Sequence, residues 1–283
     1  MSSTLTYVYC LVRSARRPSL RGIPDAMPGG SAVRVLDVSD RRPARGRPAT
    51  GGRGLTPRLW LIVSSVPERE YGQASVERGL QRLEWVGTRA MAHEAVIEHF
   101  LSAPAVLPMQ LFTLFTSDER AIDHVAKDRR RLAPILARID GCHEWGVRLT
   151  WDEAAARKAV EKKHRAGKAG GASGSGKTGG VSGASYLERK RDLFDVNRVQ
   201  FKAARAEADR LFRAMSREVS AAHRRTETEK AAPGSRLLLD AAFLVPARQG
   251  GAFRAALRRK AKELKAAGLD MSLTGPWPPY NFI

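Results

Sequence analysis

Two tracts of backbone breakers and small or basic residues interrupt this 283-residue chain, and they constrain its fold more than any other feature. Residues 41–57 (RRPARGRPATGGRGLTP) combine Gly and Pro with Arg, and residues 167–183 consist mostly of Gly, Ser, Ala and Lys. Neither tract offers an apolar surface to bury, so we expect a flexible loop at 41–57 and a linker at 167–183. The folded elements must come from the segments between and around them.

The segments before residue 152 predict one α+β domain. Apolar and β-branched runs predict strands at 5–12, 32–38, 59–63, 105–115 and 143–151, and helical patterns predict helices at 75–101 and 118–139. Ser117 or Asp118 can cap the second helix. Pro108 should force a bulge or an edge position, and Pro134 should kink its helix or restart it. The order β, β, β, α, β, α, β predicts helices layered on a sheet over residues 1–151, a ferredoxin-like arrangement in kind.

Residues 152–283 predict a second α+β domain. A helix is expected from about 185 to 226, a strand at 237–245, a helix at 251–267 and a last strand at 269–274. Apolar residues recur along the first helix at spacings of three, four or seven, which is typical of a core-facing seam. They are Phe194, Phe201, Ala208, Phe212, Met215 and Val219. Residues 275–283 (GPWPPYNFI) hold three prolines and are expected to form an extended tail.

The charge balance of the chain is strongly basic. Lys and Arg number 49 against 29 Asp and Glu, which gives a net charge of +20 and favours acidic partners. The basic residues are interleaved with Gly, Ala and Pro rather than with aromatic residues, and no nucleic-acid-binding motif accompanies them. We interpret them as a solvated basic surface and expect no specific nucleic acid, while nucleic-acid binding remains an alternative function.

Several classes of protein are excluded by what the sequence lacks. Cys10 and Cys142 are the only cysteines, which excludes a disulfide framework and a four-cysteine zinc site. No apolar run reaches the roughly 18 residues of a transmembrane helix, and the first residues show no signal-peptide pattern. We therefore expect a cytoplasmic protein without membrane association. The histidines lack metal-site spacing and no nucleophile pattern is present, so we expect no catalytic residue and no metal.

One segment matches the phosphate-binding loop pattern letter for letter. Residues 171–178 (GASGSGKT) place Gly171, Gly176, Lys177 and Thr178 at the positions of G-x-x-x-x-G-K-[ST]. Such a loop works only between a strand and a helix N-terminus, where its N–H groups converge on the phosphates. No strand precedes this segment, and no strand ending in aspartate follows suitably to bind magnesium. We interpret the match as chance and expect no cofactor, while nucleotide binding remains an alternative function.

A set of motifs in order along the chain resembles the gas vesicle accessory protein F/L family. The motifs are Tyr7-Val-Tyr9, Leu80–Val86 (LQRLEWV), Ala92–Val96 (AHEAV), Leu107-Pro108-Met109 with Thr113 and Phe115, Glu144 with Val147-Arg148, Tyr186–Lys190 (YLERK) and Leu273–Phe282 (LTGPWPPYNF). The last is the most specific, because GPWPPYSF is the signature ending of the family. The chain departs from the family at Gln110, Leu111 and Phe112, where Arg, Phe and Gly are usual.

The resemblance implies a non-enzymatic, cytoplasmic protein that is needed for gas vesicle formation. It implies contact with the hydrophobic shell protein and with other accessory proteins, and a fold of two α+β domains. The candidates for partner binding or for packing at the domain seam are Trp85, Pro108, Met109, Trp277, Tyr280 and Phe282. The aromatic tail can pack internally or onto a partner, and we favour internal packing because exposed aromatic tails promote aggregation. The oligomeric state and the choice between an F-type and an L-type role stay open.

Overall fold

The computed structural model describes residues 3–38, 57–152, 154, 183–226, 234–265 and 268–283. Almost all of both breaker-rich tracts, and the whole phosphate-loop match at 171–178, lie outside these residues. The chain divides into two compact units: unit 1 is Met1–Glu144 with Pro276–Ile283, and unit 2 is Trp145–Gly275. We had expected a boundary after residue 151 and a tail within the second domain. The tail lies in unit 1 instead, because its hydrogen-bond partners Glu94, Arg138 and Glu144 are there.

Unit 1 is built on an antiparallel sheet whose two inner strands are buried along most of their length. Its strands are β1 (Thr4–Ser14), β2 (Arg34–Asp37), β3 (Arg58–Pro67), β4 (Ala105–Pro108) and β5 (Leu114–Phe115). Their order is β2-β3-β1-β4, and β5 also pairs with β1. The β1–β3 register shifts between Val8 and Cys10, a bulge in a strand that is buried on both faces. Burial on both faces explains why 5–12 and 59–63 read as continuous apolar runs rather than as alternating ones.

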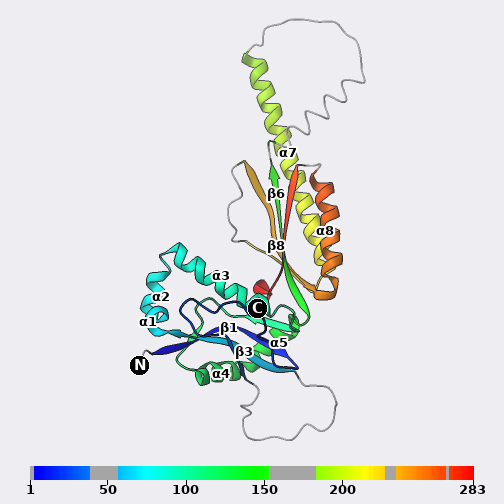
Figure 1. The fold of residues 1–283 in the computed structure, drawn as a ribbon. Helices are drawn as coiled ribbons and strands as arrows, with labels where there is room; N and C mark the ends of the chain where they lie inside the picture. Colours follow the sequence, from blue (N-terminus) through cyan, green and yellow to red (C-terminus); the bar gives the residue numbers. More distant parts are fainter. Residues whose placement is uncertain (1–2, 39–56, 153, 155–182, 227–233, 266–267) are drawn as a thin grey trace. The chain divides into compact units, whose positions relative to one another are not determined.

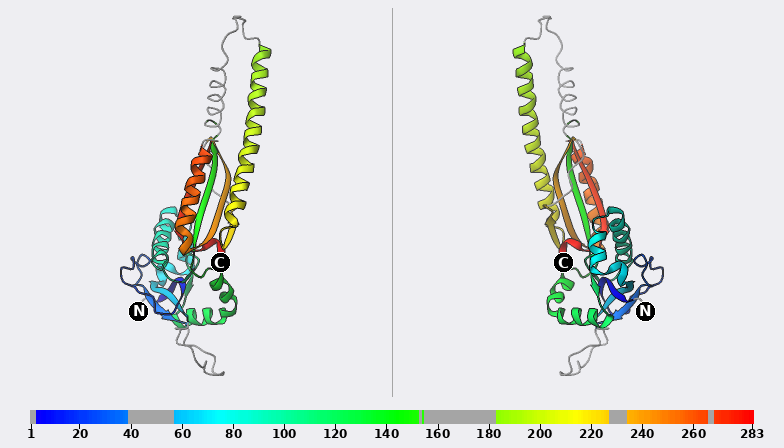
Figure 2. Two further views of the ribbon diagram at one scale, coloured as in Figure 1. Left: turned by 90° about the vertical axis from the view of Figure 1, so that its right-hand side faces the viewer. Right: turned by 90° about the vertical axis from the view of Figure 1, so that its left-hand side faces the viewer.

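Five helices flank this sheet. They are α1 (Glu68–Tyr71), α2 (Gln73–Gly79), α3 (Leu83–His99), α4 (Asp118–Lys127) and α5 (Arg129–Arg138). In Figures 1 and 2, α3 lies on one side of the strands while α4 and α5 lie on the other. On the α3 side, Val96, Ile97 and Phe100 share a core with Tyr7 and Tyr9. The predicted α+β class is thus confirmed, and three strands precede the first helix, as the sequence predicts.

The two long helices predicted for this unit are each divided. The stretch expected at 75–101 breaks into α2 and α3 at residues 80–82, where the N–H of Arg82 donates to the carbonyl of Gly79 (2.9 Å). The stretch expected at 118–139 breaks at Asp128, whose ψ is 1°. Pro134 therefore lies inside α5 and does not mark the break, which corrects the expectation of a restart there.

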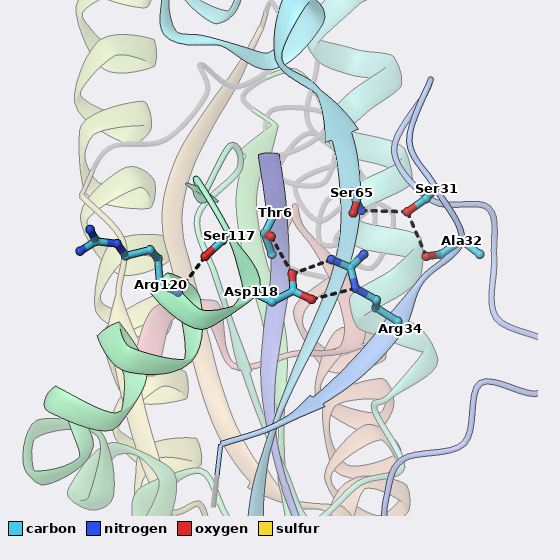
Figure 3. A network of polar contacts seen from close by, with 8 residues as sticks. All are labelled: Thr6, Ser31, Ala32, Arg34, Ser65, Ser117, Asp118 and Arg120. Carbon is cyan, nitrogen blue, oxygen red and sulfur yellow. Dashed lines mark hydrogen bonds and ion pairs between the residues drawn. The ribbon is translucent and has the colours of Figure 1, made fainter. Parts of the chain in front are cut away.

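The start of α4 is tied to the sheet by a polar network (Figure 3). Ser117 caps the helix by accepting from the N–H of Arg120 (3.3 Å), as the sequence predicts. Asp118 accepts from the hydroxyl of Thr6 (2.7 Å) and from two nitrogens of Arg34 (2.6 and 3.2 Å). Burial disfavours the Asp118 anion, but these hydrogen bonds outweigh it and hold the pKa of Asp118 below its ordinary value. The network thus connects β1, β2 and the first turn of α4 by side-chain hydrogen bonds.

Unit 2 has a four-stranded sheet packed against two helices (Figure 1). Its elements are β6 (Cys142–Asp152), α7 (Gly183–Ser216), β7 (Ala221–Arg224), β8 (Ser235–Pro246), the short η1 (Ala247–Gln249), α8 (Gly250–Lys265) and β9 (Leu269–Trp277). The strand order is β7-β8-β6-β9. The helix expected to reach 226 ends at Ser216, and 221–224 pairs with β8 as β7. Pairing with a neighbouring strand overrides the weak strand preference of Ala-Ala-His-Arg.

The apolar seam predicted for α7 forms the core of unit 2. Phe201, Ala208, Phe212, Met215 and Val219 all belong to its hydrophobic cluster, while the side chain of Phe194 lies outside the described residues. Strands and α8 complete that cluster with Trp145, Val147, Phe243, Phe253, Leu257 and Leu264. Among the residues that the structure describes, no helix is both long and apolar enough to cross a membrane.

Candidate functional site: an arginine and tryptophan pocket in unit 1

The turn between α2 and α3 brings a tryptophan against a glycine. The N–H of Leu80 donates to the carbonyl of Val76 (2.9 Å), and three residues later α3 begins. Trp85, in the first turn of α3, lies directly over Gly79, the last residue of α2. A Cβ atom on Gly79 would stand 2.5 Å from the Trp85 ring, which is closer than real Cβ contacts allow. Only glycine fits here, and its close approach fixes the position of the indole.

The Trp85 indole contacts both an aromatic ring and a guanidinium. The ring of Phe112 stacks on it with centroids 5.3 Å apart and an interplanar angle of 25°. The guanidinium carbon of Arg89, one helical turn after Trp85, lies 4.0 Å from the indole centroid and 5.2 Å from the ring centroid of Tyr71. Aromatic faces attract cations through the ring quadrupole. The two rings therefore stabilise a guanidinium that is only 8% exposed.

The buried charge of Arg89 lacks an anionic partner among the groups that contact it. Its Nη1 lies 3.4 Å from the carbonyl oxygen of Trp85, a weak contact, and its Nε is buried without a hydrogen-bond partner among the described residues. Burial raises the pKa of Tyr71 to about 12 even though the Arg89 charge opposes that shift. Tyr71 is therefore neutral and cannot balance the guanidinium. A buried donor left without a partner carries its full desolvation cost.

Arg89 and Trp85 line an open pocket with a volume of about 390 Å³. The other residues around it are Glu70, Ser75, Arg78, Gly79 and Arg82. Three arginines against one glutamate make the pocket positively charged. Arg82 is also the N-cap of α3 and makes no side-chain cap, so the positive end of the helix dipole adds to that charge. The pocket is suited to hold an anion next to an aromatic surface.

Two leucines next to the pocket in sequence are exposed. Leu80 is 53% exposed and Leu83 is 89% exposed, although both belong to the LQRLEWV motif. Single exposed leucines are common on protein surfaces. Here the two lie close in sequence to Trp85 and Arg82, and aromatic residues and arginine are the types enriched at interfaces.

Phe112, which stacks on the indole, has an unfavourable backbone conformation. Its φ is +65°, which makes it the one positive-φ residue other than glycine among the described residues. Bonds around it hold this conformation: Met109 N–H donates to the Tyr9 carbonyl (2.9 Å), and Thr113 Oγ1 donates to the Gln110 carbonyl (2.7 Å). A non-glycine residue in this region costs about 1–2 kcal/mol. The loop thus keeps a strained residue that places an aromatic ring against Trp85.

Beside the pocket lies a closed network of tyrosines and histidine. His93 Nε2 is 3.0 Å from the Met109 carbonyl oxygen, which can only accept, so Nε2 carries the proton. His93 Nδ1 then accepts from the Tyr7 hydroxyl (2.7 Å). The Tyr9 hydroxyl accepts from the N–H of Met27 (2.8 Å) and pairs with Ser64 Oγ (3.0 Å). Each of these side chains therefore has its hydrogen-bond partners inside the protein.

The ionisable groups of this closed network are held neutral. Burial lowers the pKa of His93 and raises the pKa of Tyr7 and Tyr9. Tyr7 and Tyr9 have no exposed surface and do not line the pocket. Their arrangement holds the loop at Met109–Thr113 in place and offers no reactive group to a substrate.

The C-terminal segment is anchored in unit 1 by three contacts. The Tyr280 hydroxyl donates to Glu94 Oε2 (2.8 Å), and Asn281 donates to Glu144 from both its backbone N–H (2.8 Å) and its side-chain amide (2.5 Å). Arg138 donates to the carbonyl of Phe282. Burial raises the pKa of Glu94, which the Tyr280 hydrogen bond only partly offsets. The segment is not extended to its end, since Tyr280–Phe282 forms a 3₁₀ turn, η2.

Comparison with known proteins connects this geometry to a family. The family model described as "Gas vesicle synthesis protein GvpL/GvpF" matches residues 5–283. The chain belongs to this family. The resemblance inferred from the motifs is therefore confirmed, and two residues of the LQRLEWV motif, Arg82 and Trp85, line the pocket.

Individual GvpL and GvpF proteins support the assignment. Gas vesicle protein L of Streptomyces sp. (strain CB03234) is 29% identical over 242 residues, which cover 83% of this chain and 85% of that protein. The crystal structure of GvpF from Anabaena sp. PCC7120 matches with a TM-score of 0.59 at 13% identity, covering 99% of this chain and 96% of that one. GvpF from Microcystis aeruginosa matches with a TM-score of 0.58 at 14% identity, covering 99% of both chains. The α+β fold is thus shared with GvpF.

The sequence-predicted candidates lie in three places within the structure. Trp85 forms the pocket. Pro108 ends β4, where it pairs with Cys10, and the carbonyl of Met109 accepts from His93. Trp277 is exposed at the end of β9, whereas Tyr280 and Phe282 are packed in unit 1. The phosphate-loop residues Gly171, Gly176, Lys177 and Thr178 lie outside the described residues.

Sequence reasoning missed the arginines of the pocket. Arg78, Arg82 and Arg89 were counted within the general basic surplus rather than as a site. One signal could have found Arg89: it stands four residues after Trp85 on the predicted helix, a spacing that brings side chains together. Within the described parts of the chain, no group of three or more His, Cys, Asp or Glu is arranged to hold a metal ion.

Proposed function

We propose that this protein acts in the cytoplasm during gas vesicle formation by binding the vesicle shell protein and other accessory proteins, without catalysing a reaction. Membership of the GvpL/GvpF family supports the role in vesicle formation. The best-supported docking surface is the turn between α2 and α3, with its exposed leucines and its positive pocket. We call this surface, defined by Leu80, Leu83, Arg78, Arg82 and Trp85, the α2–α3 face.

The exposure of Leu83 is the observation that carries the proposal of a binding face. A leucine that is 89% exposed gains nothing from burial in the folded chain, and it becomes favourable only when a partner covers it. Interface centres are enriched in aromatic residues and arginine, and depleted in other charged types. Trp85 and Arg82 supply that combination, and the exposed Leu83 beside them suits a partner with a hydrophobic surface.

Deletion and capture experiments test this function. Deleting the gene should abolish gas vesicles or alter their shape, which flotation and electron microscopy would record. The full-length tagged protein should recover the shell protein from a vesicle-forming lysate, and Leu83→Asp should reduce that recovery strongly. Val199→Asp is the matched control, since Val199 is 65% exposed on α7 of unit 2. Normal flotation after deletion, or equal recovery by wild type and Leu83→Asp, would contradict the proposal.

A further inference from the structure

We propose that the pocket of the α2–α3 face binds the carboxylate of a glutamate or aspartate side chain that a protein partner presents next to apolar residues. The inference rests on the proposed function, because it names the chemistry by which a partner would dock on that face. It begins with the buried guanidinium of Arg89, whose Nε has no hydrogen-bond partner among the described residues. Arg89 also lines the pocket, so a carboxylate that enters it can pair with the guanidinium, whose charge lacks an anionic partner among the groups that contact it.

The charge of the pocket favours an anion. Arg78 and Arg82 are exposed and line the pocket, and Arg82 is the N-cap of α3. These groups add positive potential to that of Arg89. Glu70 also lines the pocket and reduces the surplus. Three arginines against one glutamate leave a surplus of positive charge, which a carboxylate would reduce while pairing with the buried guanidinium.

The shape of the surroundings favours a side chain over a free small ion. The indole of Trp85 forms one wall of the pocket, and Leu80 and Leu83 stand exposed in the adjacent turn. A free carboxylate ion would leave these apolar surfaces in water. A glutamate or aspartate flanked by apolar residues would fill the pocket with its carboxylate while its neighbours cover the two leucines. The same contact would desolvate the arginine–carboxylate pair, which strengthens it.

A titration of the full-length protein tests the carboxylate specificity without a known partner. The probe is the α-amide of N-acetylglutamate, and the matched control is the same compound with glutamine. NMR would follow the guanidinium Nε–H of Arg89 and the indole N–H of Trp85 at constant ionic strength. The glutamate probe should shift both signals saturably, and the glutamine compound should leave them unchanged. Equal shifts with both compounds, or none with either, would overturn the inference.

Variants at the rim sharpen the same test. Arg82→Gln and Arg78→Gln each remove a charged donor from an exposed side chain, so the fold is retained, and each should weaken probe binding about tenfold. Arg130→Gln, on the exposed side of α5 in the same unit, removes one charge far from the pocket in sequence and should leave the affinity unchanged. An equal loss in all three variants would show a general charge effect and overturn the proposed site.

Two further measurements, a phosphate titration and the capture experiment, distinguish failure of this inference from failure of the proposed function. Inorganic phosphate that binds more tightly than the glutamate probe would overturn the choice of a carboxylate. Capture of the shell protein can fail while the probe still shifts Arg89, in which case the pocket stands and the assigned partner falls. Conversely, capture can be reduced by Leu83→Asp alone, with Arg82→Gln and Arg78→Gln having no effect. That result would support partner binding on the α2–α3 face and would show that the partner makes no carboxylate contact in the pocket.

Discussion

Arg89 and His93 lie one turn apart on α3, yet their surroundings differ in a way that separates scaffold from site. Around His93 every ring nitrogen has a partner, with Tyr7 on one side and Met109 on the other. Around Arg89 two aromatic rings stabilise the charge, but Nε has no partner among the described residues. A polar cluster in which every group has its hydrogen-bond partner makes the fold rigid. A charged group that lacks an anionic partner and lines an open pocket can instead bind a ligand.

The largest expected difference comes from removing each of these two residues. His93→Ala should lower the free energy of unfolding by about 3 kcal/mol, because it leaves a cavity and two buried groups without partners. Arg89→Met should change it by no more than about 1 kcal/mol, since loss of the cation–π contacts is offset by loss of an unpaired buried donor. Urea unfolding of both variants measures this. Similar losses in the two would contradict the contrast between closed network and open pocket.

The close approach of Gly79 to Trp85 predicts the next largest effect. Gly79→Ala should destabilise the protein by about 2 kcal/mol and disturb the indole, because the new methyl group would overlap the ring. Gly87→Ala is the matched control within α3, where an added Cβ meets no atom within 4 Å. It should stabilise the helix by up to about 1 kcal/mol. Thermal unfolding with Trp fluorescence distinguishes the two, and equal stability of both variants would refute the packing argument.

Phe112 predicts a smaller effect that depends on its backbone. Phe112→Gly and Phe112→Ala both remove the ring that stacks on Trp85, but only glycine relieves the positive φ. The glycine variant should therefore be more stable than the alanine variant by about 1 kcal/mol. Chemical denaturation of the pair gives this difference directly. An alanine variant as stable as the glycine one would show that the residue carries no strain.

The smallest expected effect is a pH dependence that belongs to the closed network. Burial lowers the pKa of His93 in the folded protein below its ordinary 6.5. Just below pH 6.5 the unfolded chain then binds more protons than the folded protein does. The contribution of neutral His93 to the free energy of unfolding is therefore complete above pH 6.5 and decreases as the pH falls from 6.5 towards the lowered pKa of the folded protein. His93→Gln should lack this part of the slope. Unfolding curves from pH 8 to 5 test it, and parallel slopes for both proteins would contradict a neutral buried His93.

Much of the secondary structure was predictable because local patterns and tertiary contacts agree. The apolar run at 5–12 is β1, and the seam from Phe201 to Val219 packs in the core of unit 2. The predictions failed where a helix had to break without proline. Residues 80–82 turn because Trp85 packs over Gly79, and α4 and α5 separate at Asp128. Neither break is marked by a proline, and the spacing of apolar residues did not reveal it.

The candidate site likewise contains residues that the sequence identified and residues that it did not. Trp85 was identified from the sequence motif, and Tyr280 and Phe282 from the signature ending. The arginines of the pocket were not, because a lysine or arginine on a helix is usually solvated and its burial depends on distant partners. Tyr71 comes from α1 and Phe112 from the loop before β5, and neither is near Arg89 in sequence.

By itself the sequence determined the α+β class, most strands, the core seam of α7 and the family. These depend on periodicity and on ordered motifs, both of which are written along the chain. Only the tertiary structure decided that the tail joins unit 1, that Phe112 adopts a left-handed conformation, and that a buried arginine faces a pocket. Each of these results from hydrogen bonds and ring contacts between segments far apart in sequence, whose energies depend on distances that no local pattern contains.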